Sequence, residues 1–362
     1  MRILAMSWRD LAHPQAGGSE VLVDKILVGL QDRGHDVALV CGGPAGDRPY
    51  PVHDVGGTYS QYLRAPILCG TRLRKCDLVI DVANGFPYFT PLWRRSPSVC
   101  LVHHIHTDQW ETRFPPPLAR AAALAERRLV PAVYRNRPFV AISPSTAAAL
   151  REMGVDQQRI RVVENGVDPV PGPVPAESPE PLFVTISRLV PHKRVGLLLE
   201  AWRQVQPVTG GRFVVVGGGP ELAALRRIAD GIPGAHIRGH IPHAEKQDLL
   251  GQAWFLVHGA HHEGWGMVIL EAAAAGRPAI AADAPGVRDT IVDGETGILV
   301  SADDTALPPA LAKAWIALAG NRALRLRMGA QARRRAAEFS WDETVRSWET
   351  VALETVAARG RR

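Results

Sequence analysis

Short apolar runs and stretches with a helical period alternate along most of the chain. Residues 2–8 form an apolar run typical of a buried strand. Apolar residues then recur at helical spacing from Val21 to Leu30, and Gly34 ends that helix. A second apolar run follows at residues 36–41. Strand, helix and strand in this order predict the beginning of a doubly wound parallel sheet, so we expect an α/β protein.

The alternation continues in two blocks of sequence. In the first block, further strands are predicted at residues 77–82, 98–104, 138–143 and 160–166. In the second block, strands are predicted at residues 182–187, 212–219, 236–241, 254–260, 278–283 and 297–300. Helices lie between these strands, and two more helices follow the last one. We therefore expect two Rossmann-like α/β domains in tandem.

A proline-rich break, residues 167–181, separates the blocks and contains six prolines and one glycine. Proline fixes φ and has no N–H group, so the break predicts a stiff linker. The predicted boundaries are residues 1–167 for the first domain, 168–181 for the linker and 182–338 for the second domain. Ligands of parallel sheets bind beyond the carboxyl ends of the strands, so the expected site is a cleft between the two domains.

Composition narrows the class of protein. The chain has 362 residues, of which 46% are hydrophobic and 22% are charged, as in ordinary soluble proteins. No apolar run reaches about 18 residues and no signal-peptide pattern is present, so we expect a cytoplasmic protein with four reduced cysteines. The net charge of +6 suits anionic ligands, a membrane surface or nucleic acid. No platform of aromatic and basic residues predicts nucleic-acid binding, and the arginine-rich stretch 322–335 is interpreted as a solvated helix face.

The stretch HHEGWGMVILEAAAAGRP, residues 261–278, carries the strongest chemical signal. Glu263 stands in a turn made possible by Gly264 and Gly266, and the helix that follows begins near Met267. Unpaired N–H groups at a helix start form an anion site. Glu271 lies one turn into this helix and can face the same way. Two carboxylates beside an anion site suit a ligand with hydroxyl and phosphate groups, although a solvated glutamate and a capping glutamate are the alternative.

Three further motifs contain cations or glycines. SRLVPHKR, residues 187–194, places Arg188 and Lys193 where they can straddle a diphosphate, or else form a surface patch. VVVGGGPE, residues 214–221, follows neither the GxGxxG nor the Walker pattern, so a nicotinamide site is disfavoured and close approach of a base or phosphate is preferred. AGGSE, residues 16–20, precedes the first helix and can supply backbone donors.

The histidines of VHHIHTDQW, residues 102–110, raise the question of a metal. His103, His104, His106 and Asp108 include suitable ligand types. However, His103 and His104 point to opposite faces of a strand, and no cysteine or distant glutamate completes a set. We therefore expect no metal, and either His103 or His104 lining the cleft. A zinc HExxH motif is also excluded, because Gly266 occupies the place of its second histidine.

Together these motifs resemble the retaining glycosyltransferases of family 4, which have the two-domain GT-B fold. The resemblance covers essentially the whole chain. Its most specific element is the pair Glu263 and Glu271, separated by seven residues. SRLVPHKR, NGVD at 165–168, GGSE at 17–20 and DGETGILV at 293–300 support it. The expected fold is therefore α/β, with two Rossmann-like domains facing each other across a cleft.

The resemblance implies a role for each motif. Glu271 would hold the ribose hydroxyls of the donor, and Glu263 would contact the donor sugar. Arg188 and Lys193 would neutralise the diphosphate, while His103 and His104 would touch the sugar or the acceptor. The remaining donor-binding residues would be Gly17, Gly18, Gly218, Gly239, His240, Gly264, Trp265, Gly266, Met267 and Val268. The first domain would then be the acceptor side, the second would bind the nucleotide sugar, and residues 339–362 would return towards the first.

The implied reaction moves a hexose from a UDP-linked or GDP-linked sugar to a hydroxyl acceptor. No DxD motif appears, so the resemblance implies a metal-independent enzyme without a cofactor. No residue is a clear nucleophile, so retention would proceed by front-face attack. The alternatives are a nucleotide-sugar epimerase on the same fold and a non-catalytic binder of nucleotide sugar or nucleic acid. The presence of both glutamates and both phosphate-loop cations argues against a non-catalytic binder.

The sequence leaves the acceptor open between a small molecule, a glycan and a lipid-linked compound. Residues 60–75 and 108–138 mix aromatic residues with arginines, which suits peripheral contact with the anionic inner surface of a membrane. An ordinary amphipathic surface and a soluble acceptor are the favoured interpretation. Prolines at 115–117 interrupt the helical period, so the sequence does not fix the direction in which the arginines point.

Overall fold

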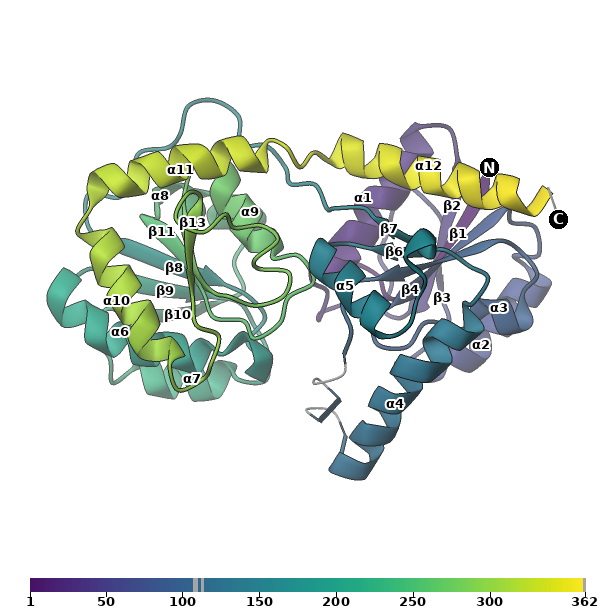
Figure 1. Ribbon diagram of the computed structural model, residues 1–362, viewed down its shortest axis with the longest axis horizontal. Helices are drawn as coiled ribbons and strands as arrows, with labels where there is room; N and C mark the ends of the chain where they lie inside the picture. Colours follow the sequence, from purple (N-terminus) through teal and green to yellow (C-terminus); the bar gives the residue numbers. More distant parts are fainter. Residues whose placement is uncertain (107–109, 112–113, 361–362) are drawn as a thin grey trace. The chain divides into compact units, whose positions relative to one another are not determined.

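The structure, a computed structural model, describes residues 1–106, 110–111 and 114–360 (Figure 1). The chain forms two compact units. The first contains Met1–Gly166 together with Trp341–Arg362, and the second contains Val167–Ser340. Each unit is a parallel sheet with helices on its faces, as the alternating sequence pattern predicts.

The sheet of the first unit has the strand order β3-β2-β1-β4-β5-β6-β7 in the described part of the chain. All neighbouring strands are parallel. The strands are β1 (Arg2–Arg9), β2 (Asp36–Gly42), β3 (Val52–Asp54), β4 (Leu78–Ala83), β5 (Ser98–Val102), β6 (Phe139–Ala141) and β7 (Ile160–Val162). The sequence pattern did not predict β3, because this edge strand is three residues long and has no fully buried residue.

The first unit also contains helices. They are α1 (Gly18–Asp32), α2 (Gln61–Thr71), α3 (Thr90–Trp93), α4 (Pro116–Val133), α5 (Pro144–Glu152), the short η2 (Gln157–Arg159) and α12 (Trp341–Gly360). The last helix, α12, packs on α1. Gly29 allows the close approach, since a Cβ atom there would lie 2.4 Å from the Val345 side chain. Arg33 also pairs with Asp342 and Glu349, so the end of the chain completes the first unit.

The sheet of the second unit has the order β10-β9-β8-β11-β12-β13 among the described residues. The strands are β8 (Leu182–Ile186), β9 (Arg212–Val216), β10 (Ala235–Gly239), β11 (Phe255–His258), β12 (Ala279–Ala282) and β13 (Gly297–Val300). The helices are the short η3 (Pro191–Lys193), α6 (Val195–Thr209), α7 (Leu222–Ala229), α8 (His243–Gln252), α9 (Met267–Ala274), α10 (Leu307–Ala319) and α11 (Arg322–Ala336). In the described part of the chain, α10, α11 and the later α12 follow β13, one helix more than expected, because Asn321 caps a new helix immediately after α10.

Each face of the second sheet has its own apolar core. Phe183, Trp202 and Trp315 are fully buried in the core beneath α6 and α10. Alanines form much of the opposite core, where α9 packs. Ala272 and Ala275 are among its buried members, which explains why alanines follow Glu271: small side chains allow α9 to pack closely on the sheet.

The proline-rich segment predicted as a linker, residues 168–181, instead belongs to the second unit. It has neither helix nor strand, as expected. Arginines from α11 and from the connection between α9 and β12 hold it. Arg333 donates to the carbonyls of Val170 and Gly172, and Arg277 donates to that of Pro175. Because proline-rich backbone has few N–H groups, its carbonyls lack partners in a regular ladder and accept from these side chains.

The arginine-rich helix α11 is therefore only partly a solvated face. Arg325 is 2% exposed, pairs with Glu177 of the proline-rich segment and lies 4.0 Å above the ring of Trp254. Arg327 and Arg334 are exposed. The helix thus has the expected solvated face, but it also uses other arginines to bind segment 168–181.

The two points where the chain passes between the units are joined to each other. The N–H of Val167, just after the first unit, donates to the carbonyl of Phe339 at 3.0 Å. Phe339 stands just before the chain enters α12. None of the helices that the structure describes is both long and apolar enough to cross a bilayer.

Candidate active site

The candidate site of the second unit lies where its strand order reverses, between β8 and β11. At such a point, the connections after the two strands run to opposite sides of the sheet, and α/β proteins bind their ligands there. The segment after β8 contains Arg188 and Lys193, and the segment after β11 contains Glu263. A hydrogen bond from the N–H of His261 to the carbonyl of His192, at 2.9 Å, joins the two segments.

Arg194 anchors the segment that presents Lys193. It has a left-handed backbone with φ of 52°, and its guanidinium is buried. The guanidinium donates to the carbonyls of Gly259 and Ala302 and pairs with Asp304, each at 2.6 Å. Arg194 is thus a structural residue, and its neighbour Lys193 carries the cation of the site. By contrast, Arg188 is exposed and makes no ion pair within the described part of the chain.

Glu263 is held by two basic side chains. Its Oε1 accepts from Nζ of Lys193 and lies 2.9 Å from Nε2 of His258. Burial by itself raises the pKa of Glu263, but the Lys193 charge and the His258 hydrogen bond outweigh it and place the pKa well below its usual range. The carboxylate is therefore ionised at neutral pH. His258 is not among the predicted site residues, because its only signal in the sequence is a polar residue at the end of an apolar strand.

Glu271 has a similar arrangement on α9. Gly266 caps this helix with φ of 74°, a conformation that favours glycine, so the backbone can turn sharply after Glu263. Glu271 then lies in the second turn, and its Oε1 is 2.7 Å from Nζ of Lys246 on α8. Both side chains are about one-fifth exposed. Lys246 is not among the predicted site residues, because its pairing with Glu271 depends on how α8 and α9 pack.

The glycine turn after β9 lies against the segment after β8 and the end of β10. The N–H of Leu189 donates to the carbonyl of Gly218, at 2.8 Å. A Cβ atom on Gly218 would come within 2.5 Å of the His240 ring. The N–H of Gly217 donates to the carbonyl of Gly239, also at 2.8 Å. The predicted residues Gly218, Gly239 and His240 are thus brought together.

Trp265, also predicted to bind the donor, has a buried side chain. Its ring packs edge-on against Phe339 with 5.2 Å between ring centroids, and only 2% of the residue is exposed. A contact between Trp265 and a ligand would have to come from its backbone. Gly264, Gly266, Met267 and Val268 form the rest of the turn and the start of α9, where backbone N–H groups are the available donors.

In the first unit, the predicted glycines stand at the start of α1. The N–H of Gly17 donates to Oε2 of Glu20 at 2.7 Å, and Ser19 Oγ donates to the same oxygen. Glu20 is 4% exposed. The N–H of Gly17 is therefore already used within α1, and a phosphate would have to displace Glu20. Gly18 is the first residue of the helix, and its role as a backbone donor stays a prediction.

The predicted histidines follow β5. His103 is buried, and its Nε2 has no hydrogen-bond partner among the described residues. Burial, with a smaller contribution from nearby His106, lowers the pKa of His103 to about 3, so the ring is neutral at pH 7. His104 is partly exposed and stacks on His106 with 4.1 Å between ring centroids.

Buried Glu126 of α4 fixes this segment. It accepts from the backbone N–H of His106 at 2.9 Å and from the indole N–H of Trp110 at 2.8 Å. His106 is therefore part of the core. Within residues 1–106, 110–111 and 114–360, no three histidines, cysteines or acids are placed to hold a metal. Asp108, considered above as a metal ligand, lies outside the described residues.

The chemistry of the second unit's site follows from these contacts. Two carboxylates, each held by a lysine, stand beside a helix start and glycine turns. Carboxylates accept from hydroxyl groups, whereas lysines and helix starts bind phosphate oxygens. This arrangement suits a ligand that carries both kinds of group.

Two family models match consecutive parts of the chain. The model described as "Glycosyltransferase Family 4" matches residues 16–170, and the model described as "Glycosyl transferases group 1" matches residues 171–335. The two ranges meet close to the boundary between the units, and they leave out residues 1–15, which contain β1, and the helix α12. Both descriptions agree with the motif that contains Glu263 and Glu271 and with SRLVPHKR, residues 187–194.

Relatives and solved structures point to the same family. A D-inositol 3-phosphate glycosyltransferase of Kineococcus radiotolerans is 33% identical over 94% of this chain and 92% of its own. A GDP-mannose-dependent alpha-(1-6)-phosphatidylinositol monomannoside mannosyltransferase of Mycolicibacterium smegmatis is 34% identical over 34% of this chain and 35% of its own. The crystal structure of Anabaena Alr3699/HepE in complex with UDP and glucose matches with a TM-score of 0.78 and 18% identity, over 97% of this chain and 98% of that one. The chain therefore belongs to glycosyltransferase family 4, has the GT-B fold and is a glycosyltransferase.

Proposed function

We propose that this glycosyltransferase is a retaining, metal-independent enzyme that moves a sugar from a UDP-linked or GDP-linked donor to a hydroxyl acceptor. The observation that carries the proposal is the pair of lysine-held carboxylates, Glu263 with Lys193 and Glu271 with Lys246, at the strand-order reversal of the second sheet. A nucleotide sugar presents hydroxyls at its ribose and at its sugar, with two phosphates between them. Two hydroxyl-binding carboxylates and a phosphate-binding cation match that order.

The proposed roles divide the donor among the residues. Glu271 binds the ribose hydroxyls, and Glu263 binds hydroxyls of the sugar. Lys193 and Arg188 face the diphosphate, and the turn around Gly218 lies near the base. The comparisons support two bases, since one solved relative carries UDP and one curated relative is named as GDP-mannose-dependent. In the first unit, His103 and His104 contact the sugar or the acceptor.

The reaction breaks the bond between the anomeric carbon and the diphosphate oxygen. The sugar becomes oxocarbenium-like, and the leaving diphosphate gains negative charge. Lys193, Arg188 and the start of α9 stabilise that charge. The acceptor oxygen attacks from the same face, and its proton passes to the departing diphosphate oxygen. Glu263 stays ionised throughout, because its pKa is held well below its usual range, so it positions hydroxyls and does not supply a proton.

A binding panel followed by a transfer assay tests this function. UDP, GDP and their sugars are compared by thermal shift, because a ligand that binds only the folded state stabilises it by mass action. The bound donor is then incubated with candidate acceptors, and the anomeric configuration of the product is read by NMR. Net retention supports the proposal. Inversion would contradict it, and consumption of the donor without any acceptor would identify an epimerase.

Metal dependence is tested in the same assay. We expect turnover to stay within about twofold of its starting value after EDTA treatment and dialysis, because Lys193, Arg188 and backbone N–H groups take the charge-stabilising part that a metal would otherwise have. A control with added Mg²⁺ should give the same rate. Loss of activity on chelation, restored by a divalent metal, would show that the metal-independent assignment is wrong.

Lys246 is expected to position Glu271. By holding one carboxylate oxygen, it leaves the other directed to the ribose. Lys246→Ala should raise the donor KM about three- to tenfold, the loss of about 1 kcal/mol expected for a partly exposed charged pair, with turnover at saturating donor within about twofold. Lys246→Arg should restore most of the affinity. If KM is unchanged in Lys246→Ala while thermal stability falls, the residue has only a structural role.

A further inference from the structure

The outer face of α2 in the first unit is apolar. Leu63 is 77% exposed and Ile67 is 68% exposed, and they lie one turn apart on the helix. Tyr59, just before the helix, is 71% exposed. The inner face consists of Gln61, Ala65 and Cys69, which are buried. The helix packs Tyr62 and Leu68 against the core but turns Leu63 and Ile67 towards solvent, where an ordinary surface helix has polar residues.

Basic residues lie close in sequence to the apolar strip formed by Tyr59, Leu63 and Ile67. Between Asp54 and Asp77 the sequence has no acidic residue and four basic ones. These four are all exposed: Arg64, Arg72, Arg74 and Lys75. One segment of 22 residues thus carries a charge of +4, against +6 for the whole chain. An apolar strip beside concentrated positive charge complements a surface that is apolar inside and anionic at its boundary.

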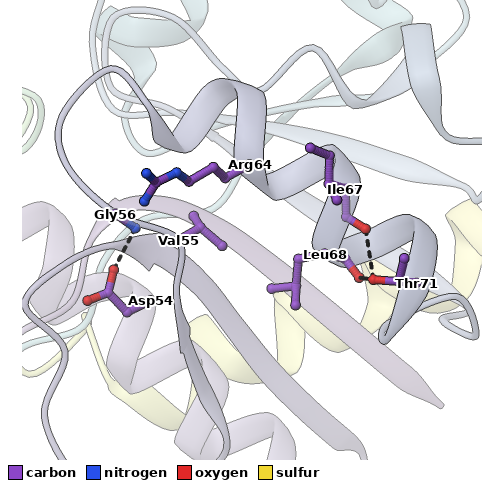
Figure 2. Close-up of a pocket in the computed structure, with 7 residues that line it drawn as sticks. All are labelled: Asp54, Val55, Gly56, Arg64, Ile67, Leu68 and Thr71. Atoms are coloured by element: carbon purple, nitrogen blue, oxygen red, sulfur yellow. Dashed lines mark hydrogen bonds between the residues drawn. The ribbon is translucent and has the colours of Figure 1, made fainter.

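A hollow lies beside the strip (Figure 2). It has a volume of about 500 Å³ and lies between α2 and the loop after β3. Arg64 and Ile67 belong to the helix side, and Asp54 and Gly56 to the opposite side. The Asp54 carboxylate accepts from the N–H of Gly56 at 2.7 Å, so it is directed to the loop backbone. The hollow gives an anionic headgroup space next to the Arg64 guanidinium.

We propose that the outer face of α2 binds an anionic lipid bilayer. Tyr59, Leu63 and Ile67 enter the headgroup boundary, while the four basic side chains meet lipid phosphates. This differs from the sequence-based expectation of an ordinary surface, because only the structure shows that Leu63 and Ile67 point outward. The surface lies on the unit that the resemblance assigns to the acceptor. Lipid binding itself does not depend on the proposed transfer reaction.

The test is co-sedimentation of the full-length protein with vesicles. Vesicles of phosphatidylcholine with about one-third phosphatidylglycerol are compared with pure phosphatidylcholine, at low and moderate salt. We expect binding to the anionic vesicles alone, weakened by salt. Arg72→Gln with Arg74→Gln should weaken binding about 30-fold, or about fivefold for each arginine. Leu63→Ser with Ile67→Ser should weaken it at least tenfold.

Matched variants in the second unit separate this surface from overall charge and hydrophobicity. Arg327→Gln with Arg334→Gln removes the same charge from α11, and Val208→Ser with Leu326→Ser removes exposed apolar residues. Both controls should bind vesicles as the parent does. The proposal is overturned if the parent does not bind anionic vesicles, if the α11 control loses as much affinity as the α2 variant, or if Leu63→Ser with Ile67→Ser binds normally.

A second copy of the chain and nucleic acid are the competing partners. In sedimentation velocity without lipid, the parent and the variant with Leu63→Ser and Ile67→Ser should have the same oligomeric state. A single-stranded oligonucleotide at the same ionic strength should not compete with the anionic vesicles. Self-association that depends on Leu63 and Ile67 would assign the outer face of α2 to a second copy of the chain. Competition by the oligonucleotide would assign it to nucleic acid. All of the changed residues are exposed, so the melting temperatures of the variants should match that of the parent, and any loss of binding reflects the surface.

Discussion

Lys193→Ala is expected to reduce turnover at saturating donor by about 100-fold or more, with a smaller change in donor KM. Lys193 stands at the end of η3, and the next residue, Arg194, anchors this segment through its contacts with Gly259, Ala302 and Asp304. The ammonium is thus fixed before the donor arrives. A fixed cation stabilises the negative charge that develops on the departing diphosphate in the transition state. Removal of Lys193 should therefore lower mainly turnover.

Controls separate this effect from damage to the site. Lys313→Ala removes an exposed lysine from α10 and should leave turnover unchanged. Lys193→Ala also leaves Glu263 with His258 as its remaining partner, so the thermal stability of each variant must be measured with its kinetics. Near-parental turnover of a folded Lys193→Ala variant at saturating donor would exclude Lys193 from charge stabilisation. A loss of turnover accompanied by a fall in the melting temperature of the variant would indicate a structural role.

Glu271→Ala is expected to weaken binding of the free nucleotide about tenfold to 100-fold, because a hydrogen bond to a charged group contributes about 1.5–3 kcal/mol. The nucleotide alone is the right probe, since the proposed contact is with the ribose. Removing Glu271 also leaves Lys246 without its partner at 2.7 Å, and that cation would then lie beside the ligand.

Titration calorimetry with UDP and GDP measures this effect, and two variants refine it. Glu271→Gln keeps the shape and one acceptor oxygen but loses the charge, so its affinity should fall between those of the parent and of Glu271→Ala. Glu200→Ala removes an exposed carboxylate from α6 and should bind as the parent does. If the nucleotide binds Glu271→Ala as tightly as the parent, the ribose assignment is wrong.

The sequence predicted the fold well because the main signal is local. Buried strands such as β4 and β8 are short apolar runs, and the helices between them repeat at 3.6 residues. The edge strand β3 lacked this signal, since it is short and not fully buried. The same limit applies to the proline-rich segment. Its lack of helix and strand follows from composition, but its attachment to the second unit depends on arginines about 100 to 160 residues away.

The candidate site divides in the same way. Glu263, Glu271 and Lys193 could be found from spacing within a motif. Their partners could not: Lys246 is 25 residues from Glu271 and meets it only through the packing of α8 on α9. His258 stands at the end of an apolar strand, where its type alone does not predict a contact with Glu263. The capping of Gly17 by Glu20 was readable in principle, because acids in the first turn commonly accept from helix N–H groups.

The bond between Val167 and Phe339 has a consequence for how such a chain can be assembled. The whole second unit leaves and re-enters the first at two adjacent backbone positions, so it is topologically an insertion between β7 and α12. The first unit needs both of its segments, because α12 packs on α1. The second unit, by contrast, is one continuous segment. The second unit could therefore be exchanged between relatives as one continuous segment with two neighbouring junctions. With the roles proposed above for the two units, such an exchange would change donor specificity and leave acceptor specificity in place.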